Sequence, residues 1–160
     1  MTQEEKYGDR DLTYSAWHRR RSTGRFVGIE SAQLLAMIDL DVMLFVEYDD
    51  DTKEPVALIE VAQDVGQSNK PSTVTRKLAE KANIPAYVTL YQASEERPNP
   101  ADPNLPDIEG FRVRRIWPQP EYKWRRLTPQ EYAESLLRMR EWQGKRIDKD
   151  IFGVTGKDGF

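Results

Sequence analysis

The chain has 160 residues, a mass of 18.6 kDa and a formal net charge of −3, a length that favours one domain with one hydrophobic core. Cysteine is absent and histidine occurs once, which excludes disulfide frameworks and zinc sites built from thiolates or several imidazoles. No apolar run approaches the length of a membrane span and no leader-like segment opens the chain, so we expect a cytoplasmic protein with no membrane partner.

Charge is distributed unevenly along the chain. Residues 1–60 contain 7 basic and 13 acidic side chains, whereas residues 111–160 contain 12 basic and 7 acidic ones. A basic flank beside an acidic centre suits a protein that holds phosphates close to a metal ion. A solvated surface of mixed sign would give the same counts, so both interpretations stay open.

The first half of the chain predicts two helices followed by two strands. Apolar spacing indicates helices at residues 12–20 and 31–38. Alternation with a period of two then predicts a strand over residues 40–48, and because both of its faces are largely apolar we expect it at the centre of a sheet. Residues 49–52 predict a turn, and residues 55–63 predict the next strand.

The second half continues with helix and strand signals around a proline-rich segment. We expect a helix over residues 71–83 and a strand over residues 84–92. Residues 93–110 contain four prolines and few apolar side chains, which predicts a long surface loop. A strand resumes over residues 111–117.

The last predicted helix begins at a capping box. Thr128 precedes Pro129, and Glu131 follows three positions after the threonine, which is the pattern of a helix start. From residue 143 the chain is polar and rich in glycine, with little to bury. We therefore predict an α/β (α+β) fold, with a mixed sheet flanked by helices in a single domain over residues 1–142 and a polar tail over residues 143–160.

Acidic side chains lie within the two apolar runs of the first half. Asp39 and Asp41 share one face of the first expected strand, and Glu60 follows an apolar run on the second. A carboxylate within a strand is costly unless a cation meets it, and the ligands available to a metal in this chain are oxygens. The layout predicts a site for Mg²⁺ or Mn²⁺ of the kind that cleaves phosphodiesters.

The order of helix, acidic strand, glutamate-bearing strand, helix and strand over residues 30–92 resembles the core of the PD-(D/E)XK nuclease superfamily. The resemblance implies a metal-dependent nuclease acting on DNA, with Asp41 and Glu60 as the strand acids, Asp39 as a competitor for the first position, and Glu30 as the helix glutamate at the metal. The strings YSAWHR, MIDLD and PVALIEVAQDVG are similar to small proteins of actinobacterial phages, which would place the protein in the cytoplasm of a host cell.

The lysine that the superfamily uses is missing from its usual place. It belongs two residues after the glutamate, where this chain has Ala62, and a methyl group can neither orient a water molecule nor offset charge. Gln63 could replace it if a bulge shifts the parity of the strand, and Lys70 or Lys77 could reach the site from the following helix. Each of the three also has an ordinary structural role open to it, so an inactive member of the superfamily remains an alternative.

Two groups of basic and aromatic side chains are candidates for contact with nucleic acid. The first is His18 with Arg19, Arg20 and Arg21, and Lys70 ahead of the helix is a further candidate. The second, interleaved with Trp117, Tyr122 and Trp124, comprises Arg114, Arg115, Arg125 and Arg126. The same residue types anchor protein interfaces, so the alternative function is a non-catalytic protein that binds nucleic acid, a host protein or a second copy of itself.

Overall fold

The structure is a computed structural model that describes residues 11–152, with side chains described as far as residue 146. Its contacts divide the chain into two compact units, Met1–Leu40 and Asp41–Phe160. Within the described residues, no helix has the length and apolar composition needed to cross a membrane.

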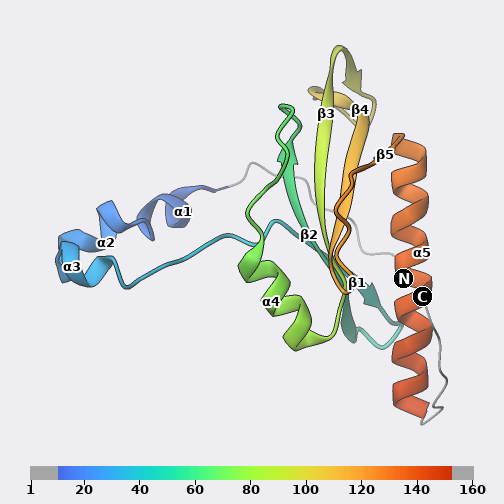
Figure 1. The fold of residues 1–160 in the computed structure, drawn as a ribbon, viewed down its shortest axis with the longest axis horizontal. Coiled ribbons are helices and arrows are strands. Elements are labelled where there is room, and N and C mark those ends of the chain that lie inside the picture. The colour runs from blue at the N-terminus through green and yellow to red at the C-terminus, as the bar shows by residue number, and fades with distance from the viewer. Residues whose placement is uncertain (1–10, 153–160) are drawn as a thin grey trace. The chain divides into compact units, whose positions relative to one another are not determined.

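The described part of the N-terminal unit consists of three short helices, α1 (Thr13–Trp17), α2 (Arg20–Val27) and α3 (Ile29–Ala32), which follow one another in Figure 1. Gly28 separates α2 from α3 with a φ of 84°, a left-handed conformation that glycine adopts without a steric penalty. The prediction of a helix over residues 31–38 is wrong, because α3 ends at Ala32 and residues 35–41 have no regular structure. Leu34 and Ile38, which were expected to face inward, are exposed, so their apolar stripe has no core to stabilise a helix.

The second unit is built on a mixed sheet of five strands in the order β1-β2-β3-β4-β5. The strands are β1 (Val42–Glu47), β2 (Lys53–Gln63), β3 (Ala86–Asn99), β4 (Asp102–Trp117) and β5 (Arg125–Leu127). β2 and β3 are parallel and are joined through helix α4 (Thr73–Ala82), whereas the other neighbours are antiparallel. The prediction of a mixed sheet flanked by helices is confirmed.

The sequence predicted that β1 lies at the centre of the sheet. This prediction is wrong, because β1 lies at the edge. Within the described residues it pairs with β2 alone. Val42, Met43 and Phe45 are nearly half exposed. Apolar residues on both faces of this run predict neighbouring strands on both sides, but they show only that neither face is strongly polar.

β3 and β4 form a long hairpin through residues 93–110, where the sequence predicted a loop (Figure 1). The pairing shifts register between Gln92 and Ala93, between Ala93 and Pro98, and between Pro98 and Asn99. Proline lacks a backbone N–H and is tolerated in a sheet at such irregularities. The prolines therefore mark a distorted ladder and not the absence of strands.

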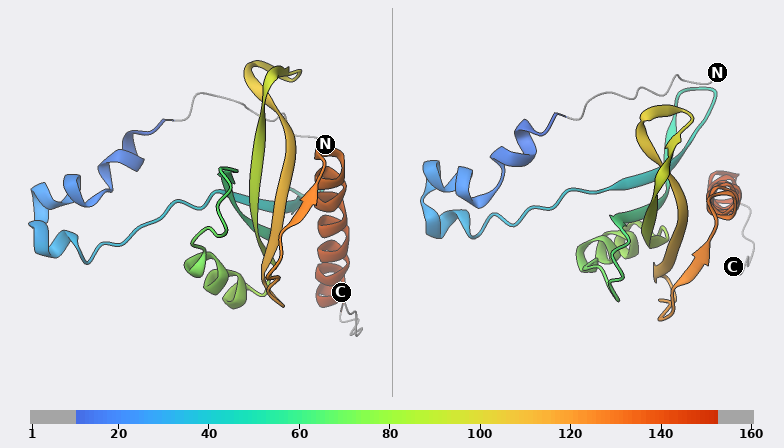
Figure 2. Two further views of the ribbon diagram at one scale, coloured as in Figure 1. Left: turned by 45° about the horizontal axis from the view of Figure 1, so that its top comes forward. Right: turned by 90° about the horizontal axis from the view of Figure 1, so that it is seen from above.

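α4 and α5 (Pro129–Phe152) cover opposite faces of the sheet, as the views in Figure 2 show. Alternation along the strands sends successive side chains to different layers. The core under α4 includes Leu58, Ala86, Val88, Leu90 and Ala79. The core under α5 includes Ala57, Tyr87, Val113, Tyr132 and Met139. Glu60 shares the parity of Leu58, so its side chain lies on the α4 face.

The capping box at the start of α5 has the predicted geometry. The Thr128 hydroxyl accepts the Glu131 N–H at 3.1 Å, and the Glu131 carboxylate accepts the Thr128 N–H at 3.0 Å. The helix continues to Phe152, so residues 143–152, assigned to the polar tail by the sequence, belong to α5. Gln143 is buried there. The rest of the expected tail lies outside the described residues.

Candidate functional site

Asp41, Glu60 and Lys70 meet on the α4 face of the sheet. Asp41 comes immediately before β1, and because Val42 pairs with Ile59, it stands opposite Glu60 across the β1–β2 ladder. Lys70 comes from the segment of residues 64–72 between β2 and α4, called here the Lys70 loop. Its Nζ lies 2.8 Å from Asp41 Oδ2 and 2.8 Å from Glu60 Oε2. Glu60 on β2 and Asp41, just before β1, therefore converge on one point.

A third oxygen contributes to the same point. Lys70 Nζ also donates a hydrogen bond to the Val61 carbonyl at 3.0 Å. A set of oxygens with two negative charges is the donor chemistry that Mg²⁺ and Mn²⁺ favour. Among the described residues no group of three or more acidic or histidine side chains could hold a metal, so any metal at this point would depend on the backbone carbonyl as well as the two carboxylates.

Glu60 is the buried member of the cluster, with 6% of its surface exposed. Its second oxygen, Oε1, accepts a short hydrogen bond from the hydroxyl of Thr75, a buried residue in the first turn of α4. The backbone N–H of Val61 donates to Asp41 Oδ2 at 2.8 Å. Because each carboxylate is hydrogen-bonded and paired with a cation, the cost of removing its charge from water is offset.

The ion pair shifts the pKa values of Asp41 and Lys70 in opposite directions. Partial burial raises the pKa of Asp41, but hydrogen bonds from the Lys70 ammonium and the Val61 N–H outweigh it and place the pKa below its ordinary value. Burial lowers the pKa of Lys70, and hydrogen bonds to Asp41 and Glu60 outweigh it and place the pKa above its ordinary value. At neutral pH Asp41 and Lys70 are therefore both charged.

Arg112 on β4 holds the start of the Lys70 loop. Its guanidinium donates to both carboxylate oxygens of Asp64, at 2.7 Å and 2.6 Å, and to the Gln67 carbonyl at 3.0 Å. The paired hydrogen bonds from Arg112 lower the pKa of Asp64 to about 2. Such a bidentate contact restricts the direction as well as the distance of the carboxylate.

The middle of the Lys70 loop is held by a second pair of side chains. Trp124 donates its indole N–H to the Ser68 carbonyl at 3.1 Å, and the Arg114 guanidinium donates to the side-chain oxygen of Asn69. The guanidinium carbons of Arg112 and Arg114 lie 5.0 Å and 4.8 Å from the centre of the Trp124 ring. These contacts fix the backbone directly before Lys70.

Of the three candidates to replace the missing lysine, Lys70 is the one that contacts the acids. Ala62 shares the face of Glu60 and packs against the core under α4. Gln63 has the opposite parity, and the bulge that would redirect it is absent, since β2 pairs with β3 without interruption from Leu58 to Gln63. Lys77 is exposed on α4 and has no ion pair among the described side chains.

In the N-terminal unit, His18 and Asp39 contact each other, and the other candidate residues are exposed. His18 Nε2 lies 3.6 Å from Asp39 Oδ1, and the His18 ring lies 5.6 Å from that of Tyr14. Asp39 is therefore engaged within this unit. Glu30 is exposed in the first turn of α3, and the exposed arginines at the α1–α2 junction are Arg19, Arg20 and Arg21.

The late basic residues do not form one patch, because strand alternation divides them between the faces of the sheet. Arg114 pairs with Val88, and Arg126 pairs with Arg112, which places both arginines on the α4 face. Arg115 pairs with Tyr87 and Arg125 with Val113, so these two lie on the α5 face. The four arginines therefore do not share one face of the sheet, and their contact with nucleic acid stays a prediction.

A basic hollow of about 300 Å³ opens beside Lys70. Lys70, Arg76, Arg114 and Arg115 line it together with the first residues of α4, and Glu121 is the acidic residue of the lining. Arg76 also lies 3.9 Å from Glu80, one turn further along α4. The balance of charge and the helix N-terminus both favour an anion at this position, next to the two acids.

The sequence did not indicate Thr75, the Val61 carbonyl or the Arg112–Asp64 pair as parts of the site. The first two follow from the register of β2 and α4, and the third joins positions 48 residues apart. No protein-family model, curated protein or solved structure matches the chain.

Proposed function

We propose that this protein is a metal-dependent phosphodiesterase that cleaves DNA, with a core of the PD-(D/E)XK nuclease type whose lysine has moved from the strand to the loop before α4. The observation that supports it best is the convergence of Asp41, Glu60 and Lys70, with the ammonium 2.8 Å from an oxygen of each acid. Two carboxylates that hold a metal ion and a lysine that stabilises developing negative charge suit this reaction.

The roles of the residues follow from their chemistry. Asp41, Glu60 and the Val61 carbonyl are the oxygens that would hold Mg²⁺ or Mn²⁺. A divalent ion supplies polarisation of the phosphate and a bound water of lowered pKa. Lys70 supplies positive charge where negative charge develops on the phosphate, and Thr75 keeps the Glu60 carboxylate oriented through its hydrogen bond.

The surroundings of the cluster support a polyanionic substrate. The hollow beside Lys70 adds the guanidinium groups of Arg76 and Arg114 on the same side of the sheet as the two acids. A phosphate held in this hollow would lie next to the carboxylates, so successive phosphates of one strand could occupy the hollow and the cluster.

The test is a cleavage assay on supercoiled, linear and single-stranded DNA with Mn²⁺, Mg²⁺ or a chelator. We expect cleavage with Mn²⁺ that is lost in Asp41→Asn and in Glu60→Gln. Asp39→Asn is the matched control, since Asp39 was the competing acid and lies beside His18 in the N-terminal unit. DNA that stays intact in every form with every metal, or equal cleavage by Glu60→Gln, would refute the proposal.

A non-catalytic binding protein is the second candidate, and one observation favours it. The Lys70 ammonium already contacts all three oxygens of the cluster and offsets one of its two negative charges, so the acids have a cationic partner without a metal. In that case the cationic hollow would bind nucleic acid, a host protein or a second copy of the chain without hydrolysis. Retention of DNA in a mobility-shift assay, with no cleavage and no dependence on Mn²⁺, would favour this candidate.

A further inference from the structure

The two outer strands of the sheet differ in how their free edges are protected. Among the described residues, no strand pairs with the outer edge of β1 or of β5. β5 has three residues, of which Arg125 and Arg126 are exposed. Short length and charge are common devices that keep a sheet edge from pairing with another chain. β1 has six residues, VMLFVE, of which only the last is charged and none is proline. The edge of β1 is therefore the less protected of the two.

The free edge of β1 is also regular. The register of β1 with β2 shifts between Leu44 and Phe45, whose partners are Ala57 and Pro55. The extra residue is therefore Val56, which belongs to the inner strand β2, and β1 itself is not interrupted. A bulge in an edge strand is a further device that prevents pairing, and here the bulge lies in the neighbouring strand. The outer backbone groups of β1 are thus presented in the geometry of an ordinary strand.

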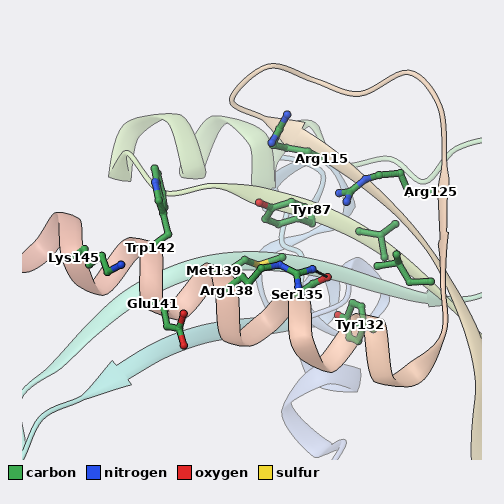
Figure 3. A pocket seen from close by; sticks show the side chains of 12 residues that line it. Tyr87, Arg115, Arg125, Tyr132, Ser135, Arg138, Met139, Glu141, Trp142 and Lys145 are labelled. Atoms are coloured by element: carbon green, nitrogen blue, oxygen red, sulfur yellow. Dashed lines mark hydrogen bonds between the residues drawn. The ribbon is translucent and has the colours of Figure 1, made fainter. Parts of the chain in front are cut away.

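One face of β1 is covered and the other is open. Val46 belongs to the core cluster against which Met139 of α5 packs, and Met139 also lines the pocket drawn in Figure 3. On the opposite face, among the described elements, α4 contacts β2, β3 and β4 but not β1. Met43 and Phe45, which alternate with Val46, are 45% and 46% exposed, with the Lys53 ammonium 5.7 Å from the centre of the Phe45 ring. An apolar edge beside an uncovered apolar face is typical of a surface that another protein covers.

We propose that β1 pairs in antiparallel orientation with β1 of a second copy of this chain, so that a twofold axis joins two five-stranded sheets into one. An axis at Leu44 brings each residue opposite one that lies on the same face. The facing pairs are then Val42 with Val46, Met43 with Phe45, and Leu44 with itself. All five positions meet an apolar partner, whereas an axis at Met43 or at Phe45 sets an acid against an apolar side chain. In this one register the strand is its own complement.

The ends of this pairing place Asp41 opposite Glu47 of the second copy. Like charges that face each other across a ladder destabilise it, but each of these acids has a lysine beside it. Lys70 Nζ lies 2.8 Å from Asp41 Oδ2, and Lys53 Nζ lies 3.9 Å from Glu47 Oε1. Because Lys70 is shared with Glu60, each end keeps one negative charge in excess. The apolar pairs between the two ends offset this cost.

Cysteine cross-linking of the full chain tests the register directly, because the chain has no cysteine of its own. In Leu44→Cys the two copies of residue 44 face each other with Cβ atoms about 4.5–5.5 Å apart, close to the span of a disulfide. Val42→Cys is the matched control on the same strand and face, since its two copies lie four positions apart, about 13 Å along the strand. We expect mild oxidation to link Leu44→Cys into a covalent dimer at least about tenfold faster than Val42→Cys.

Sedimentation measures the same association without a cross-link. We expect the wild type to have twice the 18.6 kDa mass of one chain. Met43→Lys should weaken dimerisation at least about tenfold, because a lysine on an edge strand opposes pairing. Leu137→Lys, at an exposed position on α5, is the matched control and should dimerise like the wild type. These measurements need neither metal nor DNA, so they do not depend on the proposed nuclease activity.

Three results would overturn the proposal. The first is a wild type that keeps the mass of one chain at about 100 μM, which would leave the edge to another partner or to none. The second is Val42→Cys that links as fast as Leu44→Cys, which would contradict the register. The third is a dimer that survives Met43→Lys but is lost in Leu34→Lys, since Leu34 is an exposed residue of the N-terminal unit and the contact would then lie there.

Discussion

The Lys70 ammonium lies 2.8 Å from a carboxylate oxygen of Asp41 although 29 positions separate the two residues. Asp41 comes just before β1 and Lys70 comes shortly before α4, so neither belongs to a regular element. Between them runs β2, which contributes Glu60 and the Val61 carbonyl to the same ammonium. The cluster thus combines a rigid strand with two chain segments whose positions depend on their neighbours.

Replacing Lys70 by methionine removes the cation that pairs with both Asp41 and Glu60. We expect the free energy of unfolding to fall by about 1–3 kcal/mol in the absence of metal, because buried Glu60 loses a charged partner. Mn²⁺ at 100 times its dissociation constant should then add about 2.7 kcal/mol. Urea unfolding with and without Mn²⁺ measures both effects. Lys77→Met, on the exposed side of α4, should change neither, and a Lys70→Met variant as stable as the wild type would show that the ammonium does not stabilise the acids.

Moving the lysine from residue 70 to residue 62 tests whether Lys70 has the role of the lysine that is absent there. Lys70→Ala should abolish cleavage, and adding Ala62→Lys should restore part of it, because residue 62 shares the face of Glu60. The added side chain should cost about 1–3 kcal/mol of stability by crowding the core under α4. Nicking rates in Mn²⁺ measure the rescue. Gln63→Lys in the same background is the control from the opposite face, and rescue by it instead of Ala62→Lys would contradict the assignment.

Thr75 orients the buried Glu60 carboxylate, so its hydroxyl should matter for stability. Thr75→Val keeps the shape and removes the donor, and we expect it to lower the free energy of unfolding by about 1–3 kcal/mol. Thr75→Ser keeps the donor and should cost less. Thr73→Val, an exposed position two residues earlier on α4, is the control. Equal stability of Thr75→Val and Thr75→Ser in chemical denaturation would show that the Thr75 hydroxyl does not stabilise this site.

The Asp64–Arg112 pair should make stability depend on pH at the acid end. Hydrogen bonds from Arg112 lower the pKa of Asp64 from 3.8 to about 2 in the folded state. Its contribution is therefore complete above the unfolded value and is lost as pH falls through about 2. Unfolding of the wild type and of Asp64→Asn should differ by a constant amount above pH 3.8 and converge towards pH 2. A difference that does not change over this range would show that the carboxylate is not the group responsible.

Elements with a local cause were predictable from the sequence. The capping box of Thr128 and Glu131 forms as expected, and the helix predicted over residues 71–83 corresponds to α4 (Thr73–Ala82). The strand predicted over residues 55–63 corresponds to β2 (Lys53–Gln63). In these cases spacing and end signals within about ten residues determine the element.

Placement in the sheet and the extent of the hairpin depended on distant partners. The edge position of β1 is set by where β2 pairs, and the continuation of β3 through the prolines is set by β4. No local sequence pattern predicts the edge position of β1 or the continuation of β3 through the prolines. The failed helix over residues 31–38 has a related cause, since its apolar stripe predicts a helix only if a core is present to receive it.

For the candidate site, the sequence offered three candidates to replace the missing lysine but did not distinguish between them. The two adjacent acidic segments predict that Asp41 and Glu60 lie together, and in the structure both carboxylates contact Lys70. Lys70 was one of three alternatives, because its position depends on a loop held by Arg112, 48 residues from Asp64. Such a contact cannot be read from spacing along the chain.

The location of Lys70 on a connecting loop has a consequence for how this protein can change. Removing one residue such as Ser68 would shorten the path to the ammonium by up to about 3.8 Å, more than a hydrogen bond tolerates, while every strand keeps its partners. A single insertion or deletion in an exposed segment can therefore disconnect the charged centre without unfolding the scaffold. Drift in loop length, and not only point substitution, is then a route by which descendants of this chain lose or recover the chemistry of the site.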